Sequence, residues 1–233
     1  MTSVSTSLDP LLSSTDDEYY CHYALDLFDG SSCNNLATQV SPGRHLKVLD
    51  SPVKTEAIRV RLCEDGYIAW LSATNKEDLY LASKPYQPTI LSRREIEPYL
   101  SQIIDFTKIA MTQPNYYLWG GTVGPNYDCS GLIQAAFANS GIWLPRDSYQ
   151  QENFTKRITK EELLPGDLIF FGTEKVDHVA LYLGEGYYIH SSGIQMGRNG
   201  IAIDSLSDEG DEISQGYYAK LWSFGRVIES YCA

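Results

Sequence analysis

Two different hydrophobic patterns follow one another along this chain, and the break between them constrains the fold more than any single motif. Up to about residue 82, short runs of β-type residues are separated by turn residues; over 57–62, apolar side chains and arginines alternate. After about residue 92, apolar residues recur at helical spacing. Residues 84–91 lie between the patterns and hold two prolines, which is typical of a stiff linker. The sequence therefore predicts two domains of different secondary structure.

The region before the linker divides into a tail and a strand-rich unit. Residues 1–18 are rich in Ser, Thr and Asp and are predicted to be a flexible tail. Residues 19–83 contain about five strand-like runs. That many strands in so short a stretch indicate a small all-β barrel.

Residues 92–233 combine helical and strand patterns. Ser92 and Glu95 form a capping-box pattern, from which a helix is predicted to run to about Thr112. A second helix is predicted over residues 129–139. Strands are predicted at residues 168–171, 179–183, 187–190 and about 217–228. Helices followed by an antiparallel sheet predict an α+β domain.

Charge and hydropathy exclude several classes of partner. The net charge of the 233-residue chain is −12, whereas nucleic-acid phosphates and anionic membrane surfaces both require basic side chains. The first residues contain neither the basic region nor the apolar stretch of a signal peptide. No window approaches the roughly 18 apolar residues that span a bilayer. We therefore expect a cytoplasmic protein that binds neither nucleic acid nor membrane.

The five cysteines form neither a disulfide framework nor a four-thiolate zinc site, because their number is odd and no two are spaced as CxxC. Cys129 differs from the others, because a glycine-rich segment, residues 120–131, places it in the first turn of a predicted helix. No Gly-Lys-Ser/Thr follows that segment, so it is not a phosphate-binding loop. The unpaired N–H groups of a helix start favour a thiolate and are expected to lower the pKa of Cys129.

A thiolate needs a base within reach, and two of the four histidines flank one predicted hairpin. His178 opens its first strand, His190 closes its second, and the turn lies near Gly184. Folding about that turn is expected to place the two histidines near-opposite on one face, with about 4.5–5.5 Å between their Cβ atoms. His190 then orients His178, which gives a nucleophile, a base and an orienting group.

Each of these residues also has a structural interpretation. A cysteine at a helix start is often a small buried hydrophobe, and a histidine in a strand is often a core residue. Cys129, His178 and His190 together also match a zinc site, although they lack the local pairing of ligands that zinc motifs show. Asp128 is equally well placed to cap the helix.

Four ordered motifs resemble those of the NlpC-type cell-wall cysteine peptidases. They are residues 117–121 with 128–131, then 165–168, then 178–182, and then His190. The strand-rich unit before them resembles a bacterial SH3-like domain. The combination resembles the bacterial γ-D-glutamyl-L-diamino acid endopeptidases, which cleave murein stem peptides that have a free N-terminal L-alanine.

The resemblance implies a papain-like fold over residues 92–233, with no metal and no cofactor. It implies that Cys129 is the nucleophile, His178 the general base and then acid, and His190 the orienting residue. It also implies that the hydroxyl of Tyr117 binds the oxyanion, together with the Cys129 backbone N–H.

The resemblance further implies a substrate pocket next to the nucleophile. Asp128 matches the carboxylate that pairs with the free α-amine of the substrate, and Ser130 and Ser148 match residues that line the same pocket. Tyr67 is the expected contribution of the SH3-like domain to the pocket wall. A blocked amine would leave a buried acceptor unpaired, so short peptides with a free amine are the expected substrates.

The expected activity is hydrolysis of the γ-D-glutamyl–meso-diaminopimelate bond of murein tripeptides or tetrapeptides through a thioester, in cell-wall peptide recycling. Two alternatives stay open at this point. The same thioester chemistry serves an amidase or acyltransferase, and the chain is also compatible with a non-catalytic wall-peptide binding module.

Overall fold

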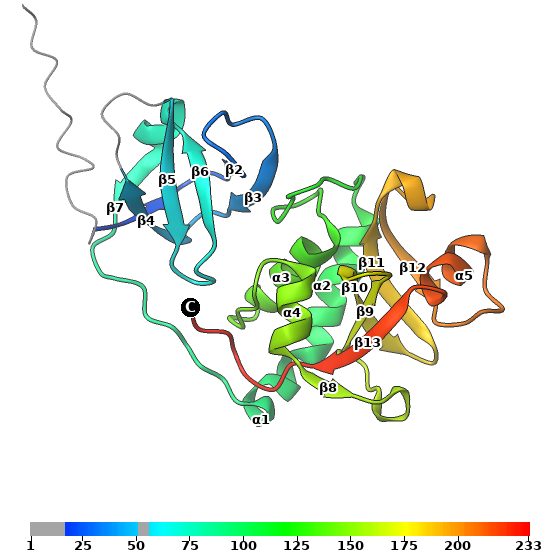
Figure 1. Ribbon diagram of the computed structural model, residues 1–233. Coiled ribbons are helices and arrows are strands. Elements are labelled where there is room, and N and C mark those ends of the chain that lie inside the picture. Colours follow the sequence, from blue (N-terminus) through cyan, green and yellow to red (C-terminus); the bar gives the residue numbers. More distant parts are fainter. Residues whose placement is uncertain (1–16, 51–55) are drawn as a thin grey trace, which may run out of the picture.

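The computed structural model describes residues 17–50 and 56–233, which form two antiparallel sheets with separate hydrophobic cores (Figure 1). The N-terminal sheet has seven strands and the C-terminal sheet has six. The predicted α+β class, with an all-β unit preceding it, is therefore confirmed. Of the predicted tail, residues 1–16 lie outside the described residues.

The N-terminal sheet follows the order β3-β2-β6-β5-β4-β1-β7. Its strands are β1 (Glu18–Cys21), β2 (Leu25–Phe28), β3 (Leu36–Val40), β4 (His45–Asp50), β5 (Ala57–Leu62), β6 (Ile68–Ser72) and β7 (Leu79–Leu81). In β5, Val60 and Leu62 are fully buried while Arg61 between them is exposed, as the alternation predicts. The sheet has more strands than predicted, because β1 and β7 are too short for a clear period-two signal.

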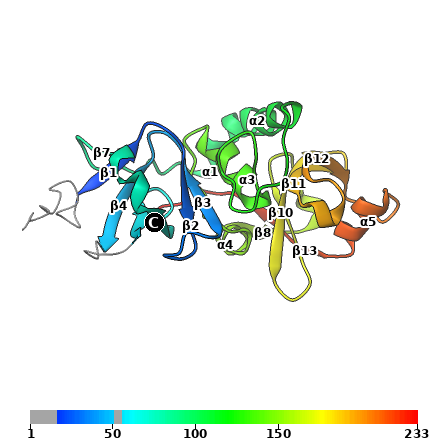
Figure 2. The same ribbon diagram turned by 90° about the horizontal axis from the view of Figure 1, so that it is seen from above.

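The C-terminal sheet follows the order β12-β11-β10-β9-β13-β8. Its strands are β8 (Lys156–Ile158), β9 (Leu168–Gly172), β10 (Val176–Gly184), β11 (Tyr187–Ser192), β12 (Gly200–Ser205) and β13 (Leu221–Arg226). The helices are α1 (Arg93–Ile96), α2 (Leu100–Thr112), α3 (Cys129–Ala138), α4 (Ser148–Phe154) and α5 (Glu212–Tyr218). Leu132 and Phe137 of α3 are fully buried in one core with Val179 and Ile189 of the sheet, and α2 lies beside α3 (Figure 2).

Three sequence predictions differ from this sheet and its helices. The first predicted helix is divided into α1 and α2 by a 3-10 turn, residues 97–99, with a proline at its start. The strand predicted from residue 217 begins only at Leu221, because Asp211 caps α5 and residues 212–218 are helical. The elements α4, β8 and β12 were not predicted: α4 and β8 are too short for a clear periodic signal, and β12 has only two large apolar residues, Ile201 and Ile203.

The two domains are joined by hydrogen bonds along the edge strand β3. Gln39 Oε1 accepts hydrogen bonds from the backbone N–H groups of Thr122 at 3.1 Å and Val123 at 3.0 Å. Thr122 Oγ1 donates to the Gln39 carbonyl oxygen at 3.0 Å. A second contact joins Gln134 of α3 to Asp65 of the N-terminal domain at 2.9 Å. Edge strand β3 therefore fixes the glycine-rich loop that leads to Cys129.

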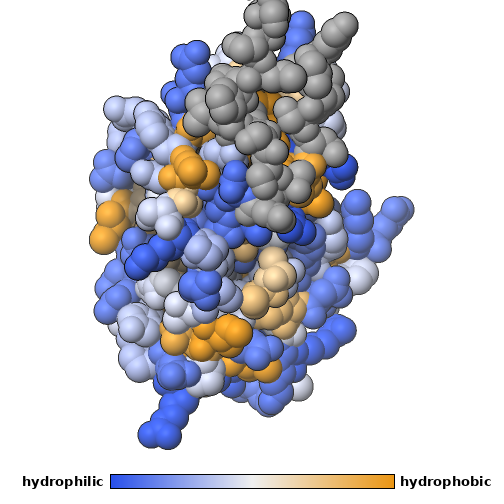
Figure 3. Space-filling model, turned by 90° about the vertical axis from the view of Figure 1, so that its left-hand side faces the viewer, coloured by the Kyte–Doolittle hydropathy of each residue, from blue (hydrophilic) through white to orange (hydrophobic). Residues whose placement is uncertain are grey.

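On the face turned to the viewer in Figure 3, apolar side chains form separate patches between hydrophilic side chains. None of the helices in the described part of the chain is both long and apolar enough to span a bilayer.

Candidate active site

Cys129 is the first residue of α3, and Asp128 caps that helix. Asp128 Oδ1 accepts a hydrogen bond from the Gly131 N–H at 2.7 Å, and its Oδ2 accepts one from the Gly120 N–H at 2.9 Å. Position 131 has no room for a side chain, because an added Cβ would lie 2.0 Å from the Gly121 carbonyl oxygen. This close packing of loop and helix fixes Cys129 at the wall of a cavity.

Burial changes the acid–base state that we expect for Cys129. The residue is 5% exposed, and this burial, together with the nearby Asp128, raises the pKa of Cys129 to about 12. The backbone N–H groups of Val179 and Ser130 lower that pKa, but by less. The predicted lowering of the pKa of Cys129 is therefore wrong, because loss of water around the thiol outweighs the effect of the helix start. At neutral pH the sulfur is a thiol, and its reaction needs a base.

His178 and His190 come together on one face of the sheet, but not in the predicted register. β10 and β11 pair Leu181 with Ile189, so His190 faces the residue two positions after His178 rather than His178 itself. The predicted near-opposite placement is wrong, because the turn lies at residues 185–186 and not at Gly184. The two histidines are diagonal neighbours, and their rings meet at a centroid distance of 5.0 Å.

The histidines belong to a buried chain of four polar side chains. His178 Nε2 lies 2.8 Å from His190 Nδ1, and His190 Nε2 lies 2.8 Å from Asp204 Oδ2. Arg198 Nε donates to Asp204 Oδ1 at 3.0 Å. Sequence reasoning missed Asp204 and Arg198, because β12, which carries Asp204, is not visible as a pattern in the sequence.

Burial and hydrogen bonding together set the charges of His178, His190 and Asp204. Burial lowers the pKa of His178, and the charges of His190 and Lys220 lower it further. Burial also lowers the pKa of His190, which the hydrogen bond to Asp204 raises only in part. Burial alone raises the pKa of Asp204, but hydrogen bonds from His190 and Arg198 outweigh it and keep the pKa below its ordinary value. At neutral pH, the imidazoles of His178 and His190 are therefore both neutral, and the carboxylate of Asp204 is ionised.

These charges determine which nitrogen atoms carry protons. The ionised Asp204 only accepts, so a neutral His190 donates its Nε2–H to it, and its Nδ1 is left as an acceptor. His178 must then donate its Nε2–H to His190 Nδ1. This leaves the Nδ1 atom of His178 with a free lone pair that can accept a proton.

A cavity of about 400 Å³ contains six of the eight predicted site residues. They are Tyr67, Tyr117, Asp128, Cys129, Ser130 and Ser148. The wall continues to Asp177, the neighbour of His178, whereas His190 lies behind His178 with no exposed surface. The N-terminal domain supplies part of the wall, including Leu36 and Tyr67. The cavity is thus built by both domains.

Tyr117 lies against the sulfur atom. Burial raises the pKa of Tyr117 above its ordinary value, and Cys129 and Asp128 raise it further. Its hydroxyl keeps its proton at neutral pH and is available as a hydrogen-bond donor beside Cys129.

Arg146 is a buried cation that connects the helix cap to the other domain. Its Nη2 donates to Asp128 Oδ2 at 2.6 Å, and its Nη1 donates to Ser130 Oγ at 2.9 Å. Its Nε donates to Thr38 Oγ1 at 3.0 Å, and its Nη2 donates to the Ala37 carbonyl oxygen at 3.2 Å. The only sequence signal for Arg146 is its place just before a capped helix start, and we missed its role.

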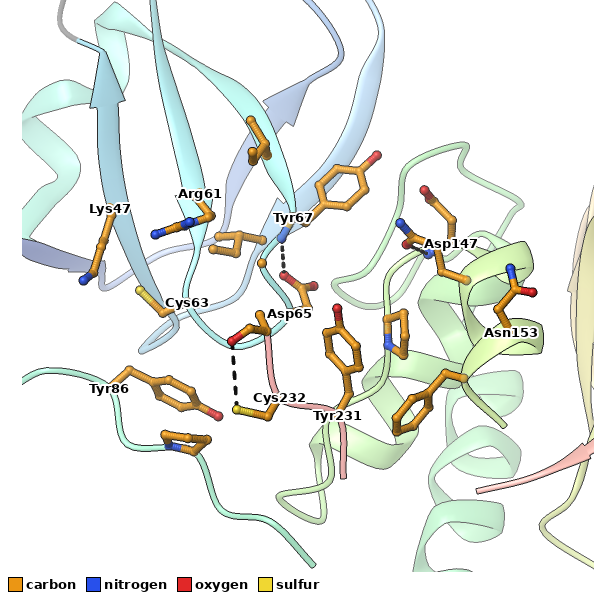
Figure 4. Close-up of a pocket in the computed structure, with 18 of the residues that line it drawn as sticks. Lys47, Arg61, Cys63, Asp65, Tyr67, Tyr86, Asp147, Asn153, Tyr231 and Cys232 are labelled. Atoms are coloured by element: carbon orange, nitrogen blue, oxygen red, sulfur yellow. Dashed lines mark hydrogen bonds between the residues drawn. The ribbon is translucent and has the colours of Figure 1, made fainter. Parts of the chain in front are cut away.

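A larger cleft of about 1060 Å³ lies next to this cavity but does not contain Cys129. The two share Tyr67, Asp147 and Tyr149. In the close-up of the cleft, Tyr67 projects from the N-terminal domain toward Asp147, and the last residues of the chain, with Tyr231, lie between the domains (Figure 4). Size alone therefore does not identify the reactive site.

The donor set does not favour a metal. Within residues 17–50 and 56–233, no group of three or more His, Cys, Asp and Glu side chains is arranged to hold a metal ion. The zinc interpretation also needs ring nitrogens that His178 and His190 use to bond each other.

Fold and site together define a papain-like α+β domain with a cysteine–histidine site, joined to an SH3-like domain. Models of two families match this division. Residues 114–220 match the NlpC/P60 family, and residues 27–75 match the bacterial dipeptidyl-peptidase SH3 domain. The chain therefore carries an NlpC/P60 domain behind a bacterial SH3 domain, as the sequence motifs predict.

Two curated proteins and one solved structure are similar to the chain. It is 34% identical over 169 residues to the γ-D-glutamyl-L-lysine dipeptidyl-peptidase of Bacillus cereus, a match that covers 71% of this chain and 46% of that protein. It is 38% identical over 119 residues to the bifunctional muramidase/DL-endopeptidase CwlT of Bacillus subtilis, covering 48% and 32%. The chain thus spans less than half the length of these relatives. The crystal structure of an NlpC/P60 family protein from Bacillus cereus superposes with a TM-score of 0.51 at 28% identity, covering 92% of this chain and 64% of that one.

Proposed function

We propose that the protein is a cysteine peptidase that hydrolyses the bond between γ-D-glutamate and a diamino acid in murein tripeptides or tetrapeptides with a free N-terminal L-alanine. One observation carries the proposal. A thiol at a helix start lines a cavity whose wall reaches Asp177, the residue before His178, and the chain from His190 to Asp204 leaves Nδ1 of His178 free. The names of the relatives, a γ-D-glutamyl-L-lysine dipeptidyl-peptidase and a DL-endopeptidase, support the same chemistry.

The acylation step follows from the proton positions. Nδ1 of His178 takes the thiol proton as the sulfur of Cys129 attacks the γ-carbonyl carbon. The oxyanion that forms accepts hydrogen bonds from the Tyr117 hydroxyl and the Cys129 N–H. When the C–N bond breaks, His178 returns the proton to the departing amine and a thioester remains. His190 and Asp204 orient the imidazole and stabilise its cationic state.

Deacylation reverses the proton transfers. His178 removes a proton from a water molecule, and the hydroxide adds to the thioester carbonyl. The C–S bond then breaks, and the proton held by His178 returns to the sulfur. The products are L-Ala-D-Glu and the free diamino acid or its remaining peptide.

The charges on the cavity wall favour a substrate with a free amine. Four aspartates line the cavity against one arginine and one lysine, which leaves a net negative wall. Asp128 accepts hydrogen bonds from Arg146, Ser130 and two backbone N–H groups, so little of its capacity is free. Asp147 lies in the same wall and shares the charge of Arg146. We assign the amine to the Asp128 and Asp147 carboxylates together, with Asp147 as its direct partner.

The shape of the cavity suggests the source of the substrate. In the intact wall the alanine amine is bonded to the glycan, so an amine-binding pocket closed by Tyr67 and Leu36 of the SH3-like domain suits released peptides. We therefore propose a role in recycling of wall fragments and, with it, a cytoplasmic location.

Product analysis tests the reaction itself. The protein is incubated with L-Ala-γ-D-Glu-meso-diaminopimelate, and products are identified by mass spectrometry for the native chain and the Cys129→Ala variant. We expect L-Ala-D-Glu from the native chain and none from the variant. No cleavage by the native chain, or transfer of the acyl group to an added amine in place of water, would contradict the proposal.

A further inference from the structure

Three consecutive residues of β10 and the turn before it line the cavity, although neighbouring strand residues normally point to opposite faces. They are Lys175, Val176 and Asp177. The pairing of β10 with β9 explains this exception: Val176 pairs with Gly172 and His178 pairs with Phe171, so Asp177 is an extra residue in the ladder. Such a bulge redirects a side chain, here next to the catalytic base.

The backbone holds this turn in one place. An added Cβ on Gly172 would lie 1.9 Å from the Lys175 carbonyl oxygen, so the turn packs directly on the end of β9. Only glycine leaves room for that approach. Lys175 and Asp177 are therefore presented from a fixed hairpin, even though both side chains are exposed.

Their position identifies the part of the substrate that they face. His178 gives its proton to the departing amine in the proposed mechanism, so the departing half lies beside His178. We place the acyl half toward Asp147 and Tyr67, the part of the wall to which the substrate amine is assigned above. Lys175 and Asp177 thus flank the departing diamino acid.

The two charges match one kind of diamino acid. Within the described residues, neither Lys175 nor Asp177 takes part in an ion pair. The distal end of diaminopimelate carries an ammonium and a carboxylate, whereas the distal end of lysine carries an ammonium alone. Trp119, which is 71% exposed, lines the same cavity and offers an apolar surface to the connecting methylene groups.

Given the proposed function, on which this step rests, we propose that Lys175 and Asp177 form a specificity site for the zwitterionic distal end of diaminopimelate. Lys175 binds the distal carboxylate and Asp177 binds the distal ammonium. The chain thereby prefers diaminopimelate peptides over lysine peptides.

Three tripeptides separate these contacts: L-Ala-γ-D-Glu followed by meso-diaminopimelate, by diaminopimelate with its distal carboxylate amidated, or by L-lysine. All three keep the distal amine and the α-carboxylate, and only the first keeps the distal carboxylate. Values of kcat/KM are measured for the native chain, Lys175→Gln and Asp177→Asn. Glu174→Gln is the matched control, because Glu174 is exposed on the same turn but does not line the cavity.

For the native chain we expect a preference of about fivefold for the first peptide, the size of one exposed charge pair. Lys175→Gln removes that preference, Asp177→Asn lowers kcat/KM for all three peptides alike, and Glu174→Gln changes neither. Lys175→Glu reverses the preference by repelling the distal carboxylate.

Two results overturn the inference alone. They are equal cleavage of the three peptides by the native chain, and an equal loss on all three in Lys175→Gln, which assigns Lys175 to the shared α-carboxylate. Failure of the proposed function looks different, because the native chain then cleaves none of the peptides.

Discussion

Two aspartate–arginine pairs differ in what they connect. Asp128, next to Cys129, pairs with Arg146, which is 2% exposed and also binds the SH3-like domain. Asp204, the partner of His190, pairs with Arg198, whose side chain is 27% exposed and also binds Asp211. The first pair couples the domain interface to the helix start, and the second sets the tautomers of the histidines. Comparable salt bridges thus hold two domains together in one case and orient two histidines in the other.

Asp204→Asn gives the largest expected loss of activity. An amide at position 204 no longer requires a donor from His190, so the Nδ1 atom of His178 is no longer held as the free base. We expect kcat to fall about a hundredfold to ten-thousandfold with little loss of stability. The control is Arg198→Gln, which leaves the carboxylate in place and should cost far less. Equal losses in the two variants would show that Asp204 acts through its ion pair and not through the tautomers.

Arg146→Met tests the other pair through stability. It leaves Asp128 buried without its cation and removes the contacts to Thr38 and Ala37. We expect the free energy of unfolding to fall by about 3–5 kcal/mol, measured by denaturant titration. Arg146→Lys keeps the charge but not the forked contact. Its unfolding free energy should therefore lie between those of the native chain and Arg146→Met. An unchanged unfolding free energy would mean that the domains do not depend on this cation.

The two buried histidines, His178 and His190, should make the stability of the protein depend on pH. The pKa values of His178 and His190 are lowered by burial, so below about pH 6.5 the unfolded chain binds protons that the folded chain does not. The stabilising effect of the neutral histidines is complete above about pH 6.5 and is lost as the pH falls toward their lowered values. Each group contributes up to about 1.4 kcal/mol per pH unit.

Unfolding free energies at about pH 7.5 and about pH 5.5 measure that slope. His190→Asn should flatten it, whereas His22→Gln should not, because His22 is an exposed residue of the N-terminal domain. A slope that His190→Asn leaves unchanged would place the titrating groups elsewhere. NMR titration of the histidine rings gives the same answer if that variant is poorly folded.

Gln39→Ala gives the smallest of these effects. The N–H groups of Thr122 and Val123 lose their shared acceptor, which costs about 1–3 kcal/mol of stability if they stay buried. Because that loop leads to Cys129, we also expect kcat to fall more than KM rises. Gln39→Glu keeps an acceptor oxygen and should restore most of kcat. A variant with lower stability and normal kinetics would make Gln39 a purely structural contact.

Local patterns predict the elements of this chain better than the contacts between them. The alternation in β5 and the apolar face of α3 are visible in the sequence, because each depends on neighbouring residues. The expected His178–His190 register was wrong by two residues, since the turn lies at residues 185–186 and not at Gly184. The roles proposed for the site residues stay predictions, although most of these residues line one cavity.

The sequence did not reveal the buried polar partners of the site residues, and the reason is physical. Asp204 and Arg146 are brought to the site by strand pairing and by domain packing, which no periodicity records. The pKa of Cys129 was predicted in the wrong direction for the same reason: the helix start is a local feature, whereas burial results from the whole fold.

The central claim is that the cavity between the domains accepts a murein peptide through its free amine and cleaves it with Cys129. The most direct measurement is the ratio of kcat/KM for L-Ala-γ-D-Glu-meso-diaminopimelate to that for its N-acetylated form. We predict a ratio of at least about tenfold, because acetylation removes the charge that Asp147 and Asp128 bind. A ratio near one would contradict the account and indicate an open cleft that does not recognise the amine.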